Sequence, residues 1–264
     1  MSDLVIVGGG NMGAALAGGL VRAGWNPASL AVVEVSAARR AVLEVELPGV
    51  VVTGELTREV VSGAGVVLAV KPADVVAEAR RAVETGAKRL LSIAAGVRLE
   101  ALEAACGTGV PVVRSMPNTP ALVGEGMAAV APGRAAGDDD LAWATTVLGA
   151  VGRVVQVTEA QLDAVTGVAG SGPAYLFLVA EALIDAGVAE GLGRPSAEAL
   201  VRQLFVGVGA MLGSGTMSPH ELRAMVTSPG GTTAAGLAAL EAQAVRSAFA
   251  AAVGAATRRS RELG

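Results

Sequence analysis

The sequence predicts an α/β fold in which a doubly wound parallel sheet precedes an all-helical region. Up to Thr158, short β-branched runs alternate with Ala-rich helical stretches, the pattern of a parallel sheet covered on both faces. After Thr158 the β-rich runs disappear, and apolar residues recur at spacings of three and four. Of the 264 residues, 52% are apolar, enough to bury a sizeable core. We therefore expect two domains, residues 1–158 and residues 159–264.

Eight β-branched runs are expected to form strands, the last two at an edge of the sheet. They are Leu4 to Gly8, Leu30 to Val35, Val50 to Thr53, Val66 to Val70, Leu90 to Ile93, Val110 to Met116, Met127 to Ala131 and Val154 to Thr158. The main helices between them are expected at Asn11 to Ala23, Ser36 to Leu47, Ala73 to Thr85 and Asp138 to Leu148.

The helical region carries more apolar surface than it can bury alone. Leu200, Leu204 and Val208 follow one helix face, and the stretch from Pro173 to Ala186 is apolar nearly all round. A lone bundle of ~100 residues cannot cover such helices without a second surface. We therefore expect a homodimer; the sequence leaves open whether dimers associate further. The polar end, residues 258–262, is expected to be a solvated last helical turn.

Composition excludes several classes of function. One Cys and one His cannot form an intrachain disulfide or the usual structural zinc site, so no metal is expected. A net charge of −4, scattered basic residues and six aromatics argue against nucleic acid as a partner. His220 follows Pro219 at an expected helix start, where a solvated helix-end residue is favoured over a catalytic base.

The chain is expected to be cytoplasmic and to have no membrane partner. Its charge-free runs, Ala164 to Ala180 and Ala224 to Leu240, fall short of the ~20 apolar residues of a spanning helix. The start, Met1-Ser2-Asp3, has neither a charged leader nor a cleavage site before the first strand.

The first strand leads into the segment Gly8-Gly9-Gly10-Asn11-Met12-Gly13 and then into a helix. This order satisfies the Gly-x-Gly-x-x-Gly fingerprint of Rossmann dinucleotide-binding domains. Gly8 permits the tight turn, Gly10 lets a pyrophosphate approach the backbone, and Gly13 allows close helix packing. The helix N-terminus, at Asn11 and Met12, supplies N–H donors to the phosphates.

Glu34 ends the second strand, 21 residues beyond Gly13, and gives conflicting indications about the cofactor. A carboxylate there accepts both ribose hydroxyls of NAD and repels the 2′-phosphate of NADP. Ser36, Arg39 and Arg40 follow closely and could hold that phosphate. NADH and NADPH therefore both remain possible cofactors.

Further candidate residues follow the next strands of the sheet. Val70, Lys71 and Pro72 end the fourth strand, at the edge where doubly wound folds bind ligands. Ala95 and Asn118 lie in loops after the fifth and sixth strands, and the polar groups beside Asn118 are expected to face the nicotinamide. A turn without function would look similar.

Two segments of the helical region place small residues and hydroxyls before a helix. They are Ala169-Gly170-Ser171-Gly172-Pro173-Ala174-Tyr175 and Thr227-Ser228-Pro229-Gly230-Gly231-Thr232-Thr233. Helix starts with exposed N–H groups and little side-chain bulk suit a carboxylate. Ordinary helix capping is the alternative, but two Gly beside two Thr exceed what a cap needs.

At these residues the sequence resembles the pyrroline-5-carboxylate reductases. The stretch from Val226 to Glu241 is similar to the C-terminal signature of that family, and Ser-Pro-Gly-Gly is its most specific part. Gly8 to Gly13, Ala69 to Pro72, Ala94 to Gly96, Met116 to Ala121 and Gly170 to Tyr175 match the family's other blocks in the same order. The resemblance covers nearly the whole chain.

The resemblance implies NAD(P)H-dependent reduction of L-1-pyrroline-5-carboxylate to L-proline, by a dimer whose two chains share each active site. It implies that Ser228, Gly231 and Thr232 bind the substrate carboxylate and that Thr233 hydrogen-bonds the ring nitrogen. Many relatives have a neutral or basic residue at the end of the second strand, so Glu34 departs from the pattern that accompanies NADPH. A protonated cyclic imine is already electrophilic, so the enzyme mainly orients the reactants and excludes water.

Three alternative functions compete with the one that this resemblance implies. β-Hydroxyacid dehydrogenases use a Lys in the helical half, whereas the only lysines here are Lys71 and Lys88. Short-chain dehydrogenases need Tyr-x-x-x-Lys, and the sole tyrosine gives Tyr175-x-x-x-Val179. A dinucleotide-sensing module without catalysis would explain the fingerprint but not the second Gly/Thr-rich helix start.

Overall fold

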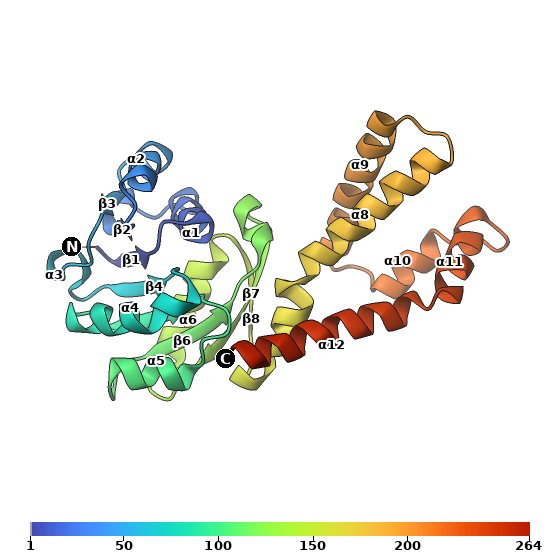
Figure 1. The fold of residues 1–264 in the computed structure, drawn as a ribbon. Helices are drawn as coiled ribbons and strands as arrows, with labels where there is room; N and C mark the ends of the chain where they lie inside the picture. The colour runs from blue at the N-terminus through green and yellow to red at the C-terminus, as the bar shows by residue number, and fades with distance from the viewer. Residues whose placement is uncertain (1) are drawn as a thin grey trace. The chain divides into compact units, whose positions relative to one another are not determined.

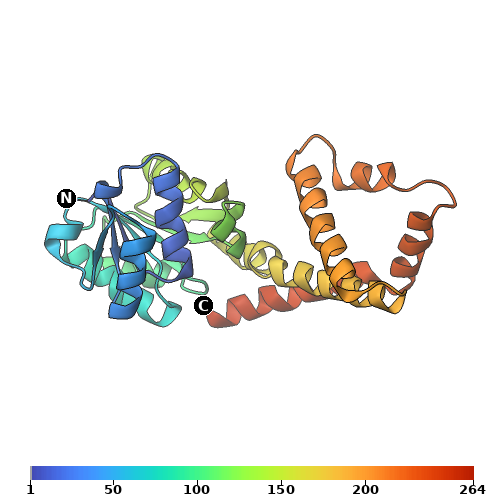
Figure 2. The same ribbon diagram turned by 90° about the horizontal axis from the view of Figure 1, so that it is seen from above.

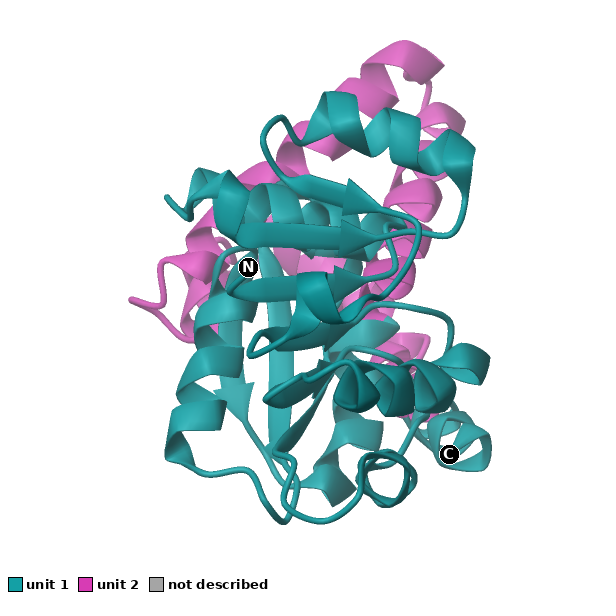
Figure 3. Ribbon diagram, turned by 90° about the vertical axis from the view of Figure 1, so that its left-hand side faces the viewer, with its two compact units in different colours: residues 1–171, 254–264 teal, residues 172–253 magenta. Residues whose placement is uncertain are grey.

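The computed structural model describes residues 2–264, which form two compact units (Figure 3). The first comprises the chain up to Ser171 together with Gly254–Gly264, and the second comprises Gly172–Val253. This division by contacts differs from the expected boundary after Thr158. The reason is that residues 159–171 and the end of the last helix pack on the sheet unit.

Within residues 2–264, eight strands form one sheet in the order β3-β2-β1-β4-β5-β6-β7-β8 (Figure 1). The strands are β1 (Leu4–Val7), β2 (Leu30–Val33), β3 (Val51–Thr53), β4 (Gly65–Leu68), β5 (Arg89–Ser92), β6 (Val112–Met116), β7 (Gly126–Pro132) and β8 (Gly152–Gln156). Each overlaps a run expected from the sequence, so the predicted strands are confirmed.

One strand runs against the others, so the sheet is mostly rather than wholly parallel. β7 pairs antiparallel with β6, whereas every other neighbouring pair is parallel. A parallel crossover needs about a dozen or more residues and usually a helix. The connection from β6 to β7 holds only the short 3₁₀ helix η2 (Thr119–Val123), so the chain turns back.

The helices of the sheet unit include all four that the sequence predicts. The four predicted helices are α1 (Asn11–Arg22), α2 (Ala37–Glu46), α4 (Pro72–Glu84) and α6 (Asp138–Gly149). The unit also contains α3 (Arg58–Val61), α5 (Leu99–Cys106), α7 (Leu162–Val165), the 3₁₀ helices η1 (Pro27–Ser29) and η3 (Glu159–Gln161), and the π-helix η4 (Thr166–Gly170). Residues 172–263 contain α8 (Gly172–Ala189), α9 (Arg194–Gly213), α10 (Pro219–Met225), α11 (Thr232–Ala242) and α12 (Val245–Leu263).

The core of the sheet unit lies on both faces of the sheet. Leu4 and Ile6 of β1 point to one face, where α1, α2 and α6 cover them. Val5 and Val7 alternate to the other face, which α3, α4 and α5 cover. This two-sided burial explains why the strands are apolar throughout rather than alternating. The carboxyl ends of the parallel strands are thereby left at one edge, where the site is built.

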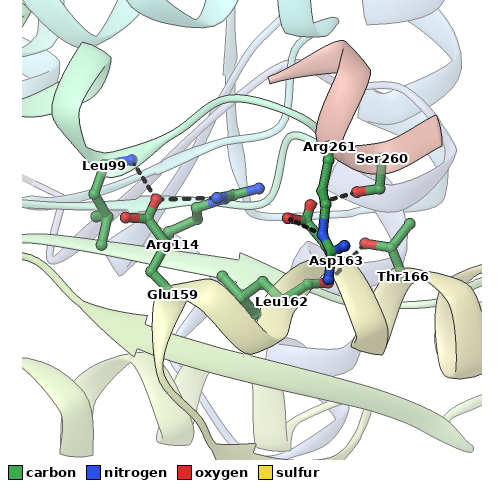
Figure 4. Close-up of polar contacts among 8 residues, drawn as sticks. All are labelled: Leu99, Arg114, Glu159, Leu162, Asp163, Thr166, Ser260 and Arg261. Atoms are coloured by element: carbon green, nitrogen blue, oxygen red, sulfur yellow. Dashed lines mark hydrogen bonds and ion pairs between the residues drawn. The ribbon is translucent and has the colours of Figure 1, made fainter. Parts of the chain in front are cut away.

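The short helices η3 and α7 connect distant segments of the sheet unit (Figure 4). Glu159 Oε1 accepts hydrogen bonds from the Leu99 amide at 2.7 Å and from the buried Arg114 guanidinium at 3.0 Å. One turn later, Asp163 Oδ1 accepts a hydrogen bond of 2.7 Å from Ser260 Oγ on α12. Ser260 is buried, so the prediction of a fully solvated last turn is wrong at this residue.

The helices of the second unit expose most of their apolar side chains. α8 packs against α9, side by side with it in Figure 1 and crossing it in the view of Figure 2. Within the part of the chain described, α8, α10 and α11 nevertheless contain no buried residue. Leu200, Leu204, Val208 and Met211, which the sequence places on one face of α9, are 41–59% exposed. Such a face requires cover from another molecule.

The helical stretch Glu159–Ala189 is long and apolar enough, by length and composition, to cross a membrane. The charge-free run alone is too short, as the sequence indicates, but the stretch from η3 to the end of α8 spans 31 residues, with a bend at Ser171 between η4 and α8. One such helix is weak evidence of a membrane span, because core helices of soluble proteins can have the same length and composition.

Candidate active site

The turn between β1 and α1 has the geometry of a dinucleotide cradle. Gly8 has a φ of +105°, and a Cβ on it would meet the Ala69 carbonyl oxygen at 2.6 Å. A Cβ on Gly13 would overlap the Gly8 carbonyl oxygen. Gly10, in contrast, faces open space, with no atom within 4 Å of an added Cβ. The first turn of α1 has no side-chain cap among the described residues, so its N–H groups suit a pyrophosphate.

A cavity of about 350 Å³ adjoins this turn at the carboxyl ends of β1, β2 and β4. Its lining consists of Val7, Gly8, Val33, Glu34, Val35, Gly54, Leu56, Val70, Asp74, Ala77, Glu78 and Arg81. Apolar walls beside a glycine-rich turn and a strand-end carboxylate are the surroundings that an adenosine requires. The residues present therefore fit a dinucleotide.

Glu34 lies at the rim of this cavity with both carboxylate oxygens hydrogen-bonded. Oε2 accepts from the Gly9 amide at 2.9 Å, and Oε1 accepts from the Ser36 amide at 2.8 Å. A Cβ on Gly9 would overlap the end of the Leu43 side chain and approach the Glu34 side chain, so a glycine here favours this contact. The backbone thus fixes the carboxylate beside the glycine-rich turn.

The two arginines after Glu34 are also bonded within the protein. Arg39 Nε donates to the Gly9 carbonyl at 2.9 Å, and its Nη2 lies 3.2 Å from a carboxylate oxygen of Glu46. Arg40 Nη1 donates to the carbonyls of Glu34 and Val35 at 2.9 Å each. Ser36 caps α2 by accepting from the Arg39 amide at 3.3 Å. These groups stabilise the loop around Glu34.

The other expected cofactor residues occupy neighbouring strand ends of the same unit. Val70 lines the cavity, and Lys71 and Pro72 form the exposed start of α4. Ala95 is exposed in the loop after β5. The structure therefore brings these residues to the same edge as the glycine-rich turn.

Asn118 uses its amide group within the sheet unit. Its Oδ1 accepts from the Met127 amide at 2.8 Å, and its Nδ2 donates to the Ala169 carbonyl at 3.1 Å. The side chain therefore joins the loop after β6 to β7 and to η4. Contact with a nicotinamide stays a prediction for this residue.

Three charged residues of the cavity were missed by the sequence analysis. Asp74, Glu78 and Arg81 lie on one face of α4, and Arg81 Nη1 is 3.3 Å from Glu78 Oε1. Their spacing of three and four residues along a helix that begins at a strand end was the signal that could have identified them.

The expected substrate residues lie in the second unit, at the start of α11. The Gly231 amide donates to the Ser228 carbonyl at 3.1 Å, which closes a turn through Gly230 at a φ of +67°. A Cβ on Gly231 would overlap the Ser228 hydroxyl. Thr232 and Thr233 are exposed in the first turn of α11, which has no side-chain cap in the described chain. This turn offers amides and hydroxyls together, as a carboxylate site requires.

The single His and the single Cys of the chain lie apart from these two segments. His220 is exposed as the second residue of α10, in agreement with the sequence analysis. Cys106 is buried, and burial, with a smaller contribution from Glu103, raises the pKa of its thiol to about 11. Among the described residues, no group of His, Cys, Asp and Glu could hold a metal ion.

Comparison with known proteins finds two family models that match this chain. The model described as pyrroline-5-carboxylate reductase dimerisation matches residues 159–263. The model described as NADP oxidoreductase, coenzyme F420-dependent, matches residues 3–96.

Whole-length relatives and solved structures are similar as well. The pyrroline-5-carboxylate reductase of Corynebacterium melassecola is 40% identical over 100% of this chain and 99% of its own length. The solved pyrroline-5-carboxylate reductase of Coxiella burnetii has a TM-score of 0.94 at 34% identity and covers 100% of this chain and 98% of its own. The Plasmodium falciparum enzyme with NADP bound has a TM-score of 0.83 at 29% identity, with 100% and 98% covered.

Proposed function

Because the chain belongs to the pyrroline-5-carboxylate reductase family, we infer that it is an NAD(P)H-dependent enzyme that reduces L-1-pyrroline-5-carboxylate to L-proline. The observation that carries this inference is the likeness over the whole chain, 40% identity to a relative of nearly the same length. The match to the coenzyme F420-dependent family ends at residue 96, so it supports a dinucleotide-binding domain rather than a different reaction.

The glycine-rich turn and the cavity beside it form the cofactor site in this proposal. The N–H groups at the start of α1 bind the pyrophosphate, and the cavity takes the adenosine with Glu34 at its rim. Lys71, Pro72, Ala95 and Asn118 define the side on which the nicotinamide is held. A bound reduced nicotinamide supplies the hydride for the C=N carbon.

The turn Ser228–Gly231 and the first residues of α11 form the substrate site. The Gly231 amide is already used in the turn, so the carboxylate is held by the Ser228 hydroxyl and by the amides that open α11. Gly231 serves by leaving room for that hydroxyl, and Thr232 contributes its amide and hydroxyl. The Thr233 hydroxyl accepts from the ring N–H and can then donate to the amine that forms.

Two helical units complete the enzyme in this proposal. The exposed apolar faces of α8 and α9, together with the dimerisation match, support a homodimer in which each active site draws on both chains. Association of dimers, a cytoplasmic location and the lack of nucleic-acid or membrane partners stay predictions from the sequence. The functional division into residues 1–158 and 159–264 also stays a proposal; the dimerisation match begins at residue 159.

A direct assay tests the proposed function. The purified protein is mixed with pyrroline-5-carboxylate and either NADH or NADPH, and the absorbance of the reduced nicotinamide is followed. We expect oxidation of the nicotinamide and formation of proline in equal amounts. Tight cofactor binding without turnover would instead favour a sensing module.

A further inference from the structure

We propose that this enzyme selects NADH over NADPH and that Glu34, held by two backbone amides, makes the selection. The inference rests on the proposed reduction and names the cofactor that its site takes. The sequence alone does not decide between the two cofactors, because a carboxylate and two arginines follow the second strand together. The side-chain contacts of these three residues resolve the question.

The carboxylate cannot turn away from the ribose position without losing two hydrogen bonds. Glu34 accepts from Gly9 at 2.9 Å and from Ser36 at 2.8 Å, so each oxygen has one fixed donor. A carboxylate oxygen accepts more than one hydrogen bond, so each can also receive a ribose hydroxyl. The hydroxyls at the 2′ and 3′ positions are donors, and they suit this arrangement.

The neighbouring cations are turned toward other partners. Arg39 donates to the Gly9 carbonyl and pairs with Glu46, and Arg40 donates to the backbone carbonyls of Glu34 and Val35. The Ser36 amide, at the start of α2, would suit a phosphate, but it donates to Glu34. Each guanidinium is thus partly engaged, and Arg39 already pairs with a carboxylate, which weakens the attraction that either cation offers to a 2′-phosphate.

The charges that line the cavity oppose a phosphate as well. Three carboxylates, Glu34, Asp74 and Glu78, face one cation, Arg81, and that cation pairs with Glu78 at 3.3 Å. A phosphate at the 2′ position would bring a dianion to a cavity of net negative charge. Specificity commonly depends on such a repulsive element as well as on favourable contacts.

Binding measurements without substrate test the proposal independently of the reaction. NADH and NADPH are titrated into the full-length protein, and their fluorescence gives the two Kd values. We expect NADH to bind at least about tenfold more tightly than NADPH. The difference between the two Kd values should decrease as added salt screens the repulsion between the 2′-phosphate and the carboxylates of the cavity. Equal affinities, or tighter binding of NADPH, would overturn the proposal.

A glutamine substitution tests whether Glu34 is the residue responsible. Glu34→Gln keeps the size of the side chain, removes its charge and can accept only one of the two amide hydrogen bonds, and we expect the ratio of the NADPH Kd to the NADH Kd to fall by about tenfold. The control Glu44→Gln makes the same change at an exposed glutamate of α2 outside the cavity lining, and its ratio should equal that of the parent. If Glu34→Gln has the same ratio of NADPH Kd to NADH Kd as the parent protein, Glu34 does not discriminate between the two cofactors.

Two further measurements keep the outcomes separate. If Glu34→Gln does not fold, Asp74→Asn removes another carboxylate of the cavity and leaves the Glu34–Gly9 hydrogen bond in place. This variant should also lower the ratio of the NADPH Kd to the NADH Kd. The kcat/KM values with pyrroline-5-carboxylate are then compared for both cofactors. Selective binding of NADH without any turnover would contradict the proposed reaction and leave the cofactor inference standing.

Discussion

Thr233 is the second residue of α11 and is an exposed residue in the described chain. We expect Thr233→Val to lower kcat/KM by about ten- to a hundredfold, because an unpaired donor in a closed site costs about 1–3 kcal/mol. Thr233→Ser, which keeps the hydroxyl, is the matched control and should retain most activity. Cofactor affinity, measured by fluorescence titration, should not change. Parental rates in a folded, dimeric Thr233→Val would show that the hydroxyl only caps the helix.

Cys106 illustrates a residue whose chemistry is suppressed by its surroundings. Burial, and to a lesser extent the charge of Glu103, raises the pKa of the thiol from 9.0 to about 11. The reactive thiolate is therefore about a hundredfold less abundant near pH 8 than in an exposed thiol. Alkylation by iodoacetamide should be at least that much slower in the folded protein than in the urea-unfolded chain. Similar rates in the two states would contradict the buried position.

At the scale of elements, the turn η3 stabilises α5 and β6 through a single carboxylate. Glu159 accepts from the Leu99 amide at the start of α5 and pairs with Arg114, whose side chain is 7% exposed. Glu159→Ala leaves a buried guanidinium without its carboxylate, and we expect it to lower the free energy of unfolding by about 3 kcal/mol. Chemical denaturation measures the loss.

A surface ion pair provides the control for this substitution. Arg259 and Glu262 lie 2.9 Å apart on α12, with both side chains more than 60% exposed. Glu262→Ala should change the free energy of unfolding by less than about 1 kcal/mol, because exposed pairs contribute little. If both variants lose the same free energy of unfolding, the burial of Arg114 does not strengthen its ion pair with Glu159.

The elements also show which features can be predicted from sequence. The strands were found because β-branched runs are bounded by turns, and the cofactor turn was found because its glycines lie next to each other in the chain. The direction of β7 depends on the length of a loop, and the burial of Ser260 depends on Asp163, 97 residues away. The contacts that fix Glu34 depend on rotamers, which composition and periodicity do not specify.

At the scale of the whole molecule, the second unit requires a partner chain to bury its helices. Phe177 and Leu178 of α8 are 66% and 65% exposed, and Val208 of α9 is 45% exposed. We expect sedimentation at low micromolar concentration to give at least twice the chain mass of 25.9 kDa. An active monomer at that concentration would contradict the proposed dimer.

A single charge on this exposed apolar face should prevent dimerisation without unfolding the chain. Val208→Glu places a carboxylate on the exposed apolar face of α9, where a partner chain would bury it without a counter-ion. We expect this variant to sediment as a monomer and to lose activity, while NADH still binds to its sheet unit. Val45→Glu makes the same change at a valine of α2 that is 82% exposed, and it should remain dimeric and active. If Val208→Glu is still a dimer, the interface lies on another face of the helical unit. If the variant is a monomer and remains active, each chain holds a complete active site.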